Sequence, residues 1–363
     1  MKRLVVMFLL VPLLLADNAA PKMQIALLLD TSNSMDGLIN QAKSKLWVVV
    51  NEMATARRNG QIPELEVALY EYGNNGLSME SGYVRCLSPL TRDLDLISEK
   101  LFALQTNGGE EYCAWVIDTA MQLNWSADTG TYKAIFIAGN EPFNQGPKAF
   151  EPICKAAISR GIVVNTIFCG NRSEGEMTGW KKGAELADGS FFCLDQDQAV
   201  AAIQTPVDQK ILDLNQRLNA TYVAYGSAGK EYKQRQVAQD ANATSMSSEV
   251  AVNRALSKKN AAYNNTDWDL VDAVAEGVVD VEKPESEAAL PEPMRDMKPE
   301  ERKAYVEKLG KERATIQKEL SALEKERQAF IDKEIKKQTA TLDDLVVKSV
   351  KEQAKRRGYV FNQ

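Results

Sequence analysis

The sequence predicts an α/β protein in which a doubly wound, mostly parallel sheet is followed by an α-helical region with a long carboxy-terminal helix. Between Met23 and about Val200, short apolar runs alternate with helical patterns, as in a sheet covered by helices on both faces. After Val200, strand-like runs become rare, and all five cysteines lie before this point. From Lys298 onward a charged helical pattern begins. At about 150 residues per domain, the 363 residues are enough for two or three domains.

Six strand-like runs define the expected sheet. The first, from Met23 to Asp30, is apolar along most of its length, which is typical of a strand buried on both faces. The runs at 65–72 and 83–86 follow each other closely, so they predict a hairpin and one antiparallel edge strand. The other runs lie at 133–138, 162–168 and 190–194. Helices are expected after the first strand to about Arg58, and near 93–104, 110–123, 147–160 and 175–187.

The amino terminus has the order of a secretory signal peptide. Lys2 and Arg3 precede an unbroken apolar run, residues 4–15, and small and polar residues follow. The apolar run is too short to span a bilayer comfortably, so we expect removal of residues 1–20, with cleavage between Ala16 and Ala20. The mature chain would then have no transmembrane segment and would be exported.

The chain after the sheet divides into three expected parts: a helical region at 201–281, a connector rich in Pro and Glu at 282–297, and a long charged helix or helical hairpin at 298–363. The long helix repeats apolar residues every seven positions, as in a coiled coil, but Arg313 and Arg327 interrupt the companion seam. We expect it to fold onto a final helix at about 342–354. Self-association through the helix is the alternative. The repeating residues are Leu309, Ile316, Leu323 and Phe330.

Composition excludes several functions. The chain has 44 basic and 50 acidic residues and no dense basic block, which argues against nucleic-acid binding. It has no histidine, so Ser-His-Asp and Cys-His catalysis and histidine zinc sites are excluded. Any catalysis would depend on carboxylates, Lys, Tyr, Cys or a metal held by oxygen ligands.

The cysteines allow two interpretations. In an oxidising compartment, Cys169 and Cys193 could form a disulfide, because each closes an apolar run and the two runs could be neighbouring strands. Alternatively, several of the cysteines are buried free thiols.

A cation-binding pattern follows the first strand. Asp30, Ser32 and Ser34 form the pattern D-x-S-x-S on an expected strand-to-helix turn, at the carboxyl edge of the sheet where ligands gather. One carboxylate and two hydroxyls suit Mg²⁺ or Mn²⁺, and Ca²⁺ less well. The alternative is an ordinary helix start capped by Ser or Asp.

With the alternating elements and the antiparallel edge strand, this motif resembles the von Willebrand factor type A (VWA) domain over residues 21–200. The resemblance implies a metal-ion-dependent adhesion site with Asp30, Ser32 and Ser34 as its first motif. A second loop in the family supplies a Thr or Glu ligand. Counting from the glycine pair of loop 105–111 favours Glu111 for this position, and the alternatives are Thr106 and, less favoured, Glu110.

The third motif of the family departs here from its usual form. Gly139 stands where the resemblance implies an Asp, and Asn140 or Glu141 lies near enough to serve instead. The region after Val200 is similar to the tails of uncharacterised exported bacterial proteins, which implies a periplasmic or extracellular place in a bacterial envelope. Its most distinctive stretches are 235–236 and 265–272.

The expected function is that of an exported binding or adhesion protein, with no catalytic residues. Its metal, Mg²⁺ or Mn²⁺, would engage a protein partner that offers a carboxylate or another oxygen ligand. One alternative is a metal-assisted hydrolase with a carboxylate base. Another is a structural envelope protein that assembles through its carboxy-terminal helix.

Overall fold

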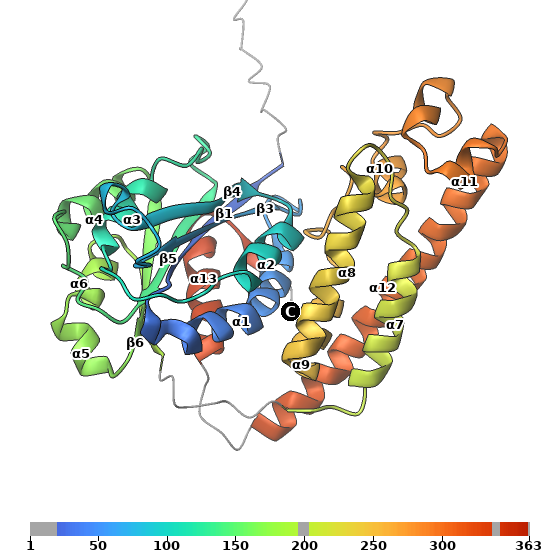
Figure 1. Ribbon diagram of the computed structural model, residues 1–363. Coiled ribbons are helices and arrows are strands. Elements are labelled where there is room, and N and C mark those ends of the chain that lie inside the picture. Colours follow the sequence, from blue (N-terminus) through green and yellow to red (C-terminus); the bar gives the residue numbers. More distant parts are fainter. Residues whose placement is uncertain (1–19, 195–202, 336–341, 362–363) are drawn as a thin grey trace, which may run out of the picture.

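The computed structural model describes residues 20–194, 203–335 and 342–361 (Figure 1). The predicted signal peptide lies, apart from Ala20, outside the described residues. Among the described residues, no helix is both long and apolar enough to cross a membrane.

A six-stranded sheet forms the centre of the first part of the chain, in the order β4-β3-β1-β5-β6-β7. All neighbouring strands are parallel except β4, which is antiparallel to β3 at one edge, so the predicted hairpin and edge strand are confirmed. The central strand β1 is buried along most of its length, because its apolar side chains alternate between two helix-covered faces. The strands are β1 (Lys22–Asp30), β3 (Glu64–Tyr72), β4 (Val84–Thr91), β5 (Tyr132–Gly139), β6 (Ile162–Cys169) and β7 (Phe191–Leu194).

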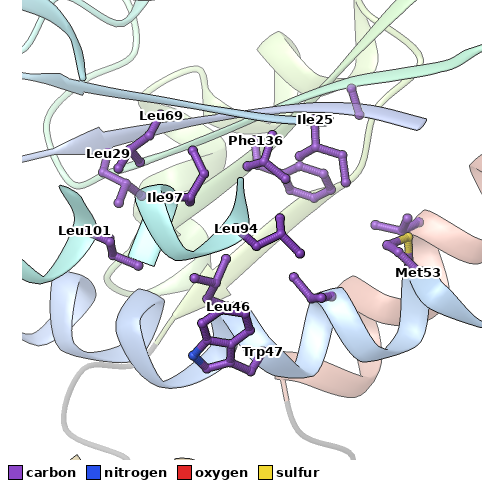
Figure 2. Close-up of a cluster of buried hydrophobic side chains, with 14 of the residues drawn as sticks. Ile25, Leu29, Leu46, Trp47, Met53, Leu69, Leu94, Ile97, Leu101 and Phe136 are labelled. Carbon is purple, nitrogen blue, oxygen red and sulfur yellow. The ribbon is translucent and has the colours of Figure 1, made fainter. Parts of the chain in front are cut away.

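Helices cover both faces of the sheet. One face packs against α1 (Asp36–Ala54), α2 (Leu94–Phe102) and α13 (Leu342–Lys355). Figure 2 shows this cluster, in which Leu46 and Trp47 of α1 lie on the side that faces strand residues such as Ile25. The opposite face is covered by α3 (Cys113–Ala120), α4 (Phe150–Ser159), α5 (Arg172–Met177) and α6 (Trp180–Glu185). The predicted doubly wound, mostly parallel α/β fold is therefore confirmed.

The last helix, α13, packs on the sheet. It contacts β7 and α1, and Val350 and Ala354 are fully buried in the core of that face. After α13, β8 (Val360–Phe361) pairs with β2 (Ala56–Arg57), while the Tyr359 hydroxyl donates to the Lys22 carbonyl at 2.5 Å. The expected hairpin of the long helix with this final helix is wrong, because the apolar face of α13 is buried against the sheet instead.

Residues 203–335 form a helical region beside α1 and α2 (Figure 1). Its long helix α12 packs against α7, α9 and α10. The predicted Pro- and Glu-rich connector is folded into a 3₁₀ turn and a short helix, in which Leu290 and Met294 are buried. The helices are α7 (Asp208–Ala220), α8 (Gly229–Met246), α9 (Ser248–Ser257), α10 (Leu270–Ala275), η3 (Pro284–Ala289), α11 (Glu292–Arg295) and α12 (Pro299–Ile335).

The apolar stripe of α12 is largely buried inside this chain. Ile316 and Leu320 are fully buried against the α7 and α9 core. The two arginines that interrupt the heptad are also buried: Arg313 pairs with Asp269 and Asp272, and Arg327 with Asp208. The residues that interrupt the heptad therefore form ion pairs that attach α12 to other helices of the same chain.

All five cysteines lie among the described residues, and all are free. The predicted disulfide between Cys169 and Cys193 is wrong, and the register explains why. Cys193 pairs with Phe168, whereas Cys169 pairs with Leu194. The two cysteines are thus one position out of register and belong to opposite faces of the sheet, since side chains alternate along a strand.

Candidate metal centre

The D-x-S-x-S turn lies at the carboxyl end of the central strand. Asp30 is the last residue of β1, and the chain turns through η1 (Asn33–Met35) into α1. The Thr31 amide donates to the Tyr72 carbonyl at 2.9 Å, and the Ser32 amide donates to Asp30 Oδ1 at 2.8 Å. These bonds hold the buried Asp30 and Ser32 side chains at the sheet edge. The backbone of Ser34 belongs to η1, and its side chain lies outside the described part of the structure.

A second loop, between α2 and α3, brings Glu111 to Asp30. The Asn107 amide donates to the Thr31 carbonyl at 2.9 Å, which joins this loop to the D-x-S-x-S turn. Gly73 lies against both carboxylates: a Cβ there would stand 2.8 Å from Glu111 Cγ and 2.9 Å from Asp30 Oδ1. Gly73 also has a φ of +78°, so the position favours glycine for two independent reasons. The absence of a side chain at Gly73 lets the two carboxylates approach.

A second glycine permits the loop to pack this closely. A Cβ at Gly109 would lie 2.2 Å from the Gly73 carbonyl oxygen, so only glycine fits. The Glu111 amide then donates to Gln145 Oε1 at 3.1 Å, which fixes the backbone at the ligand position. The sequence analysis did not identify Gly73 or Gln145. Gly73 could have been noticed as a glycine directly after a predicted strand, whereas the sequence holds no comparable signal for Gln145.

The electrostatics of the site favour a cation. Burial raises the pKa of Asp30 to about 7, against hydrogen bonds from Ser32, and the Glu141 charge adds to the rise. Burial, followed by the charges of Asp30 and Glu141, raises the pKa of Glu111 to about 7 as well. Neither Asp30 nor Glu111 forms an ion pair within the described residues, and Asp30 Oδ2 is buried there without a hydrogen-bond partner. A bound cation would satisfy this oxygen and neutralise the pair.

The other candidate residues are placed differently. The Thr106 hydroxyl donates to Asp36 Oδ1 at 2.7 Å, so it is engaged at the start of α1. Glu110 is exposed to solvent. Asn140 and Glu141 follow β5, and the Glu141 carboxylate lies within electrostatic reach of Asp30 and Glu111. The geometry therefore favours Glu111 over Thr106 and Glu110.

Gly139 has a steric role. A Cβ at this position would lie 2.5 Å from the Tyr72 hydroxyl and 3.1 Å from Asp30 Oδ2. The Tyr72 hydroxyl donates to the Ala138 carbonyl at 2.9 Å and so occupies the space beside β5. An aspartate at position 139 would collide with Tyr72, a residue that the sequence analysis did not single out.

The available donors suit a hard cation. Within the described ranges, no three His, Cys, Asp or Glu side chains gather as a metal cluster. A metal here would therefore take the carboxylates of Asp30 and Glu111 together with serine hydroxyls. Such an oxygen set fits Mg²⁺ or Mn²⁺, with coordination positions left for water or for a partner.

The topology and the motif agree with one family. The sheet has an antiparallel edge strand, helices on both faces, and D-x-S-x-S at the end of its central strand. Residues 22–194 therefore have the strand order and the turn motif that the resemblance to the VWA domain implies. The candidate metal centre occupies the carboxyl edge of this sheet, between the turn after β1 and the loop that carries Glu111.

Several solved structures resemble the chain, each over about half of its length. The conserved hypothetical protein BatB from Bacteroides thetaiotaomicron is 16% identical, with a TM-score of 0.37 over 48% of this chain and 90% of that one. The VWA domain of SpRpn10 is 15% identical, with a TM-score of 0.37 over 50% of this chain and 100% of that one. The vWF domain of the type V pili tip protein Mfa5 from Porphyromonas gingivalis is 12% identical, with a TM-score of 0.35 over 49% and 91%. No protein-family model matches the chain, and no curated protein matches it.

Proposed function

We propose that this protein is an exported binding protein whose VWA domain holds a divalent cation, Mg²⁺ or Mn²⁺, and engages a protein partner through it. Asp30, Ser32, Ser34 and Glu111 would hold the ion, and a carboxylate of the partner would complete its coordination. The cation would supply a Lewis-acidic position at the sheet edge. The amino-terminal sequence supports export, and the acidic balance of the chain supports a protein partner over nucleic acid.

One observation carries the proposal: two carboxylates, Asp30 and Glu111, are buried side by side with no basic partner among the described residues. Burying an unpaired charge is costly, and burying two adjacent like charges is costlier. A divalent cation removes both costs.

A hydrolytic function has less support. Cys113 is the thiol beside this site, but burial raises its pKa, and its neighbour is the fully buried Tyr72, whose pKa burial raises as well. A thiol nucleophile needs a depressed pKa, whereas the pKa of this thiol is raised. Binding is therefore the function that the site supports best.

The test is metal-induced thermal stabilisation of the protein. Titration with MgCl₂ or MnCl₂ should raise the Tm of the wild type, by the equivalent of about 2.7 kcal/mol when the ion reaches a hundred times its Kd. Glu111→Gln should lose the increase. Glu110→Gln is the matched control, because Glu110 is adjacent but exposed, and it should keep the increase. An equal response of both variants would contradict the proposed ligand set.

A further inference from the structure

A polar cavity lies directly beside the candidate metal centre. It has a volume of about 460 Å³ and is bounded by the ends of β3 and β4, the last turn of α2 and the loop 105–107. The volume is within the range of ~300–1,000 Å³ that is typical of small-ligand sites. None of the proposed metal ligands lines the cavity, so no role is assigned to it yet.

The charge of the cavity is positive. Glu71 is buried at its base and pairs with the Arg85 guanidinium through both Nε and Nη2, so the two charges offset each other. Lys100 supplies a further cation at the rim, and its ion pair with Glu99, at 3.4 Å, is long and exposed, so it holds the ammonium weakly. Leu87 and Leu104 contribute apolar surface beside these cations. The lining thus suits a short aliphatic chain that ends in a carboxylate.

Two hydrogen bonds of Thr31 connect the turn that carries the candidate metal ligands to the lining of the cavity. Thr31, between the candidate ligands Asp30 and Ser32, accepts a hydrogen bond from the Asn107 amide at 2.9 Å and donates through its hydroxyl to Glu71 at 3.4 Å. The register places Leu29 opposite Glu71 and Asp30 opposite Tyr72. Thr31 therefore links the candidate metal ligands on either side of it to Glu71 and Asn107 of the cavity.

The walls of the cavity are held in place before anything binds. Asn74 Nδ2 donates to the Gln105 carbonyl at 3.1 Å, and the Asn75 amide donates to the Gly108 carbonyl at 2.8 Å. These bonds tie the loop after β3 to the loop after α2. Preformed walls reduce the ordering cost of binding.

We propose that this cavity is a second recognition site, which accepts an acidic side chain of the partner beside the carboxylate bound to the metal. This proposal rests on the proposed function only in that one partner makes both contacts, one with the metal and one with the cavity. Anion binding in the cavity itself uses Lys100, whose charge no residue of the cavity lining offsets, and requires no metal. The site would make the protein selective for a segment with two acidic groups.

The experiment is an NMR titration of the ¹⁵N-labelled protein with N-acetyl-glutamate amide in the presence of EDTA, and with N-acetyl-glutamine amide as the neutral control. We expect saturable shifts at the amides of residues 100–107 and of Arg85 with the glutamate compound, and at least fivefold weaker binding of the glutamine compound. Lys100→Gln should weaken glutamate binding at least fivefold. Lys182→Gln, an exposed lysine on α6, should leave it unchanged.

Equal binding of the two compounds, or an unchanged affinity in Lys100→Gln, would overturn the assignment. Lys100 is 40% exposed, so its substitution preserves the fold and a negative result is interpretable. Because EDTA removes divalent ions, the titration reports on the cavity alone. If the proposed metal site does not bind a metal, the thermal-shift test shows it, and the outcome of the NMR titration is unaffected.

Discussion

Gly139 and the Tyr72 hydroxyl exclude any larger residue at position 139, because a Cβ there would stand 2.5 Å from the hydroxyl oxygen. The hydroxyl is fully buried and donates to the Ala138 carbonyl. Position 139 departs from the VWA pattern, which has an aspartate there. The space that such a side chain would need is taken by Tyr72, at the end of β3.

Gly139→Ala should lower the free energy of unfolding by about 1–3 kcal/mol through overpacking. Adding Tyr72→Phe should recover part of that loss, because it removes the oxygen that the new Cβ meets. Urea denaturation of both single variants and the double variant measures the coupling. Strictly additive losses would show that the two residues do not compete for this space.

The placement of α13 on the sheet gives a second prediction. Val350 is fully buried between the sheet and α1, so Val350→Ala should cost about 1–3 kcal/mol by removing buried methyl groups. Lys348→Ala, on the exposed side of the same helix, should cost less than about 0.5 kcal/mol. Equal effects of the two substitutions on urea unfolding would argue against this packing.

The burial of Arg313 inside the chain gives a third prediction. Arg313→Ala leaves Asp269 and Asp272 without their cation and should destabilise the helical region by about 3–5 kcal/mol. Lys311→Ala is a control two positions away, because its ion pair with Glu307 is exposed and spans 4.0 Å. Thermal unfolding followed by circular dichroism compares them. If α12 instead formed a two-chain coiled coil, unfolding of the wild type would depend strongly on protein concentration.

The fourth prediction concerns Asp240 and the stability of the folded protein at low pH. The charges of Lys258 and Arg254, acting against burial, hold the pKa of this carboxyl well below its usual range. A carboxyl with a lowered pKa in the folded state contributes stability above its unfolded pKa of about 4, and the contribution is lost as the pH falls toward the folded value. The wild type should therefore lose stability below about pH 4, and Asp240→Asn should show a flatter acid profile. Equal acid slopes in urea unfolding would contradict this role.

Sequence patterns predicted the sheet well for a physical reason. Strands buried on both faces are apolar over most of their length, so β1, β5 and β6 stand out from the sequence alone. The position of α13 was not predictable in this way. An amphipathic helix shows which of its faces is buried, but its pattern does not show whether that face packs on α12 or on the sheet.

The candidate site was predicted in part. The positions of Asp30 and Ser32 could be predicted, because Asp30 ends β1 and Ser32 lies in the turn that follows, at the sheet edge. The choice between Thr106, Glu110 and Glu111 depends on the path of a loop, which the close approach of Gly73 and Gly109 determines. Such a contact between distant segments leaves no periodic signal. The separation of Cys169 and Cys193 likewise depends on a strand register that the sequence does not specify.

The central claim is that Asp30 and Glu111 bind one divalent ion together. Anomalous diffraction from crystals soaked in MnCl₂ tests it most directly, since manganese identifies itself by its signal. We predict one peak within about 2.5 Å of both carboxylates and of the Ser32 hydroxyl, as expected for a metal with oxygen ligands. Manganese found elsewhere, or no peak at a concentration that saturates thermal stabilisation, would contradict the claim.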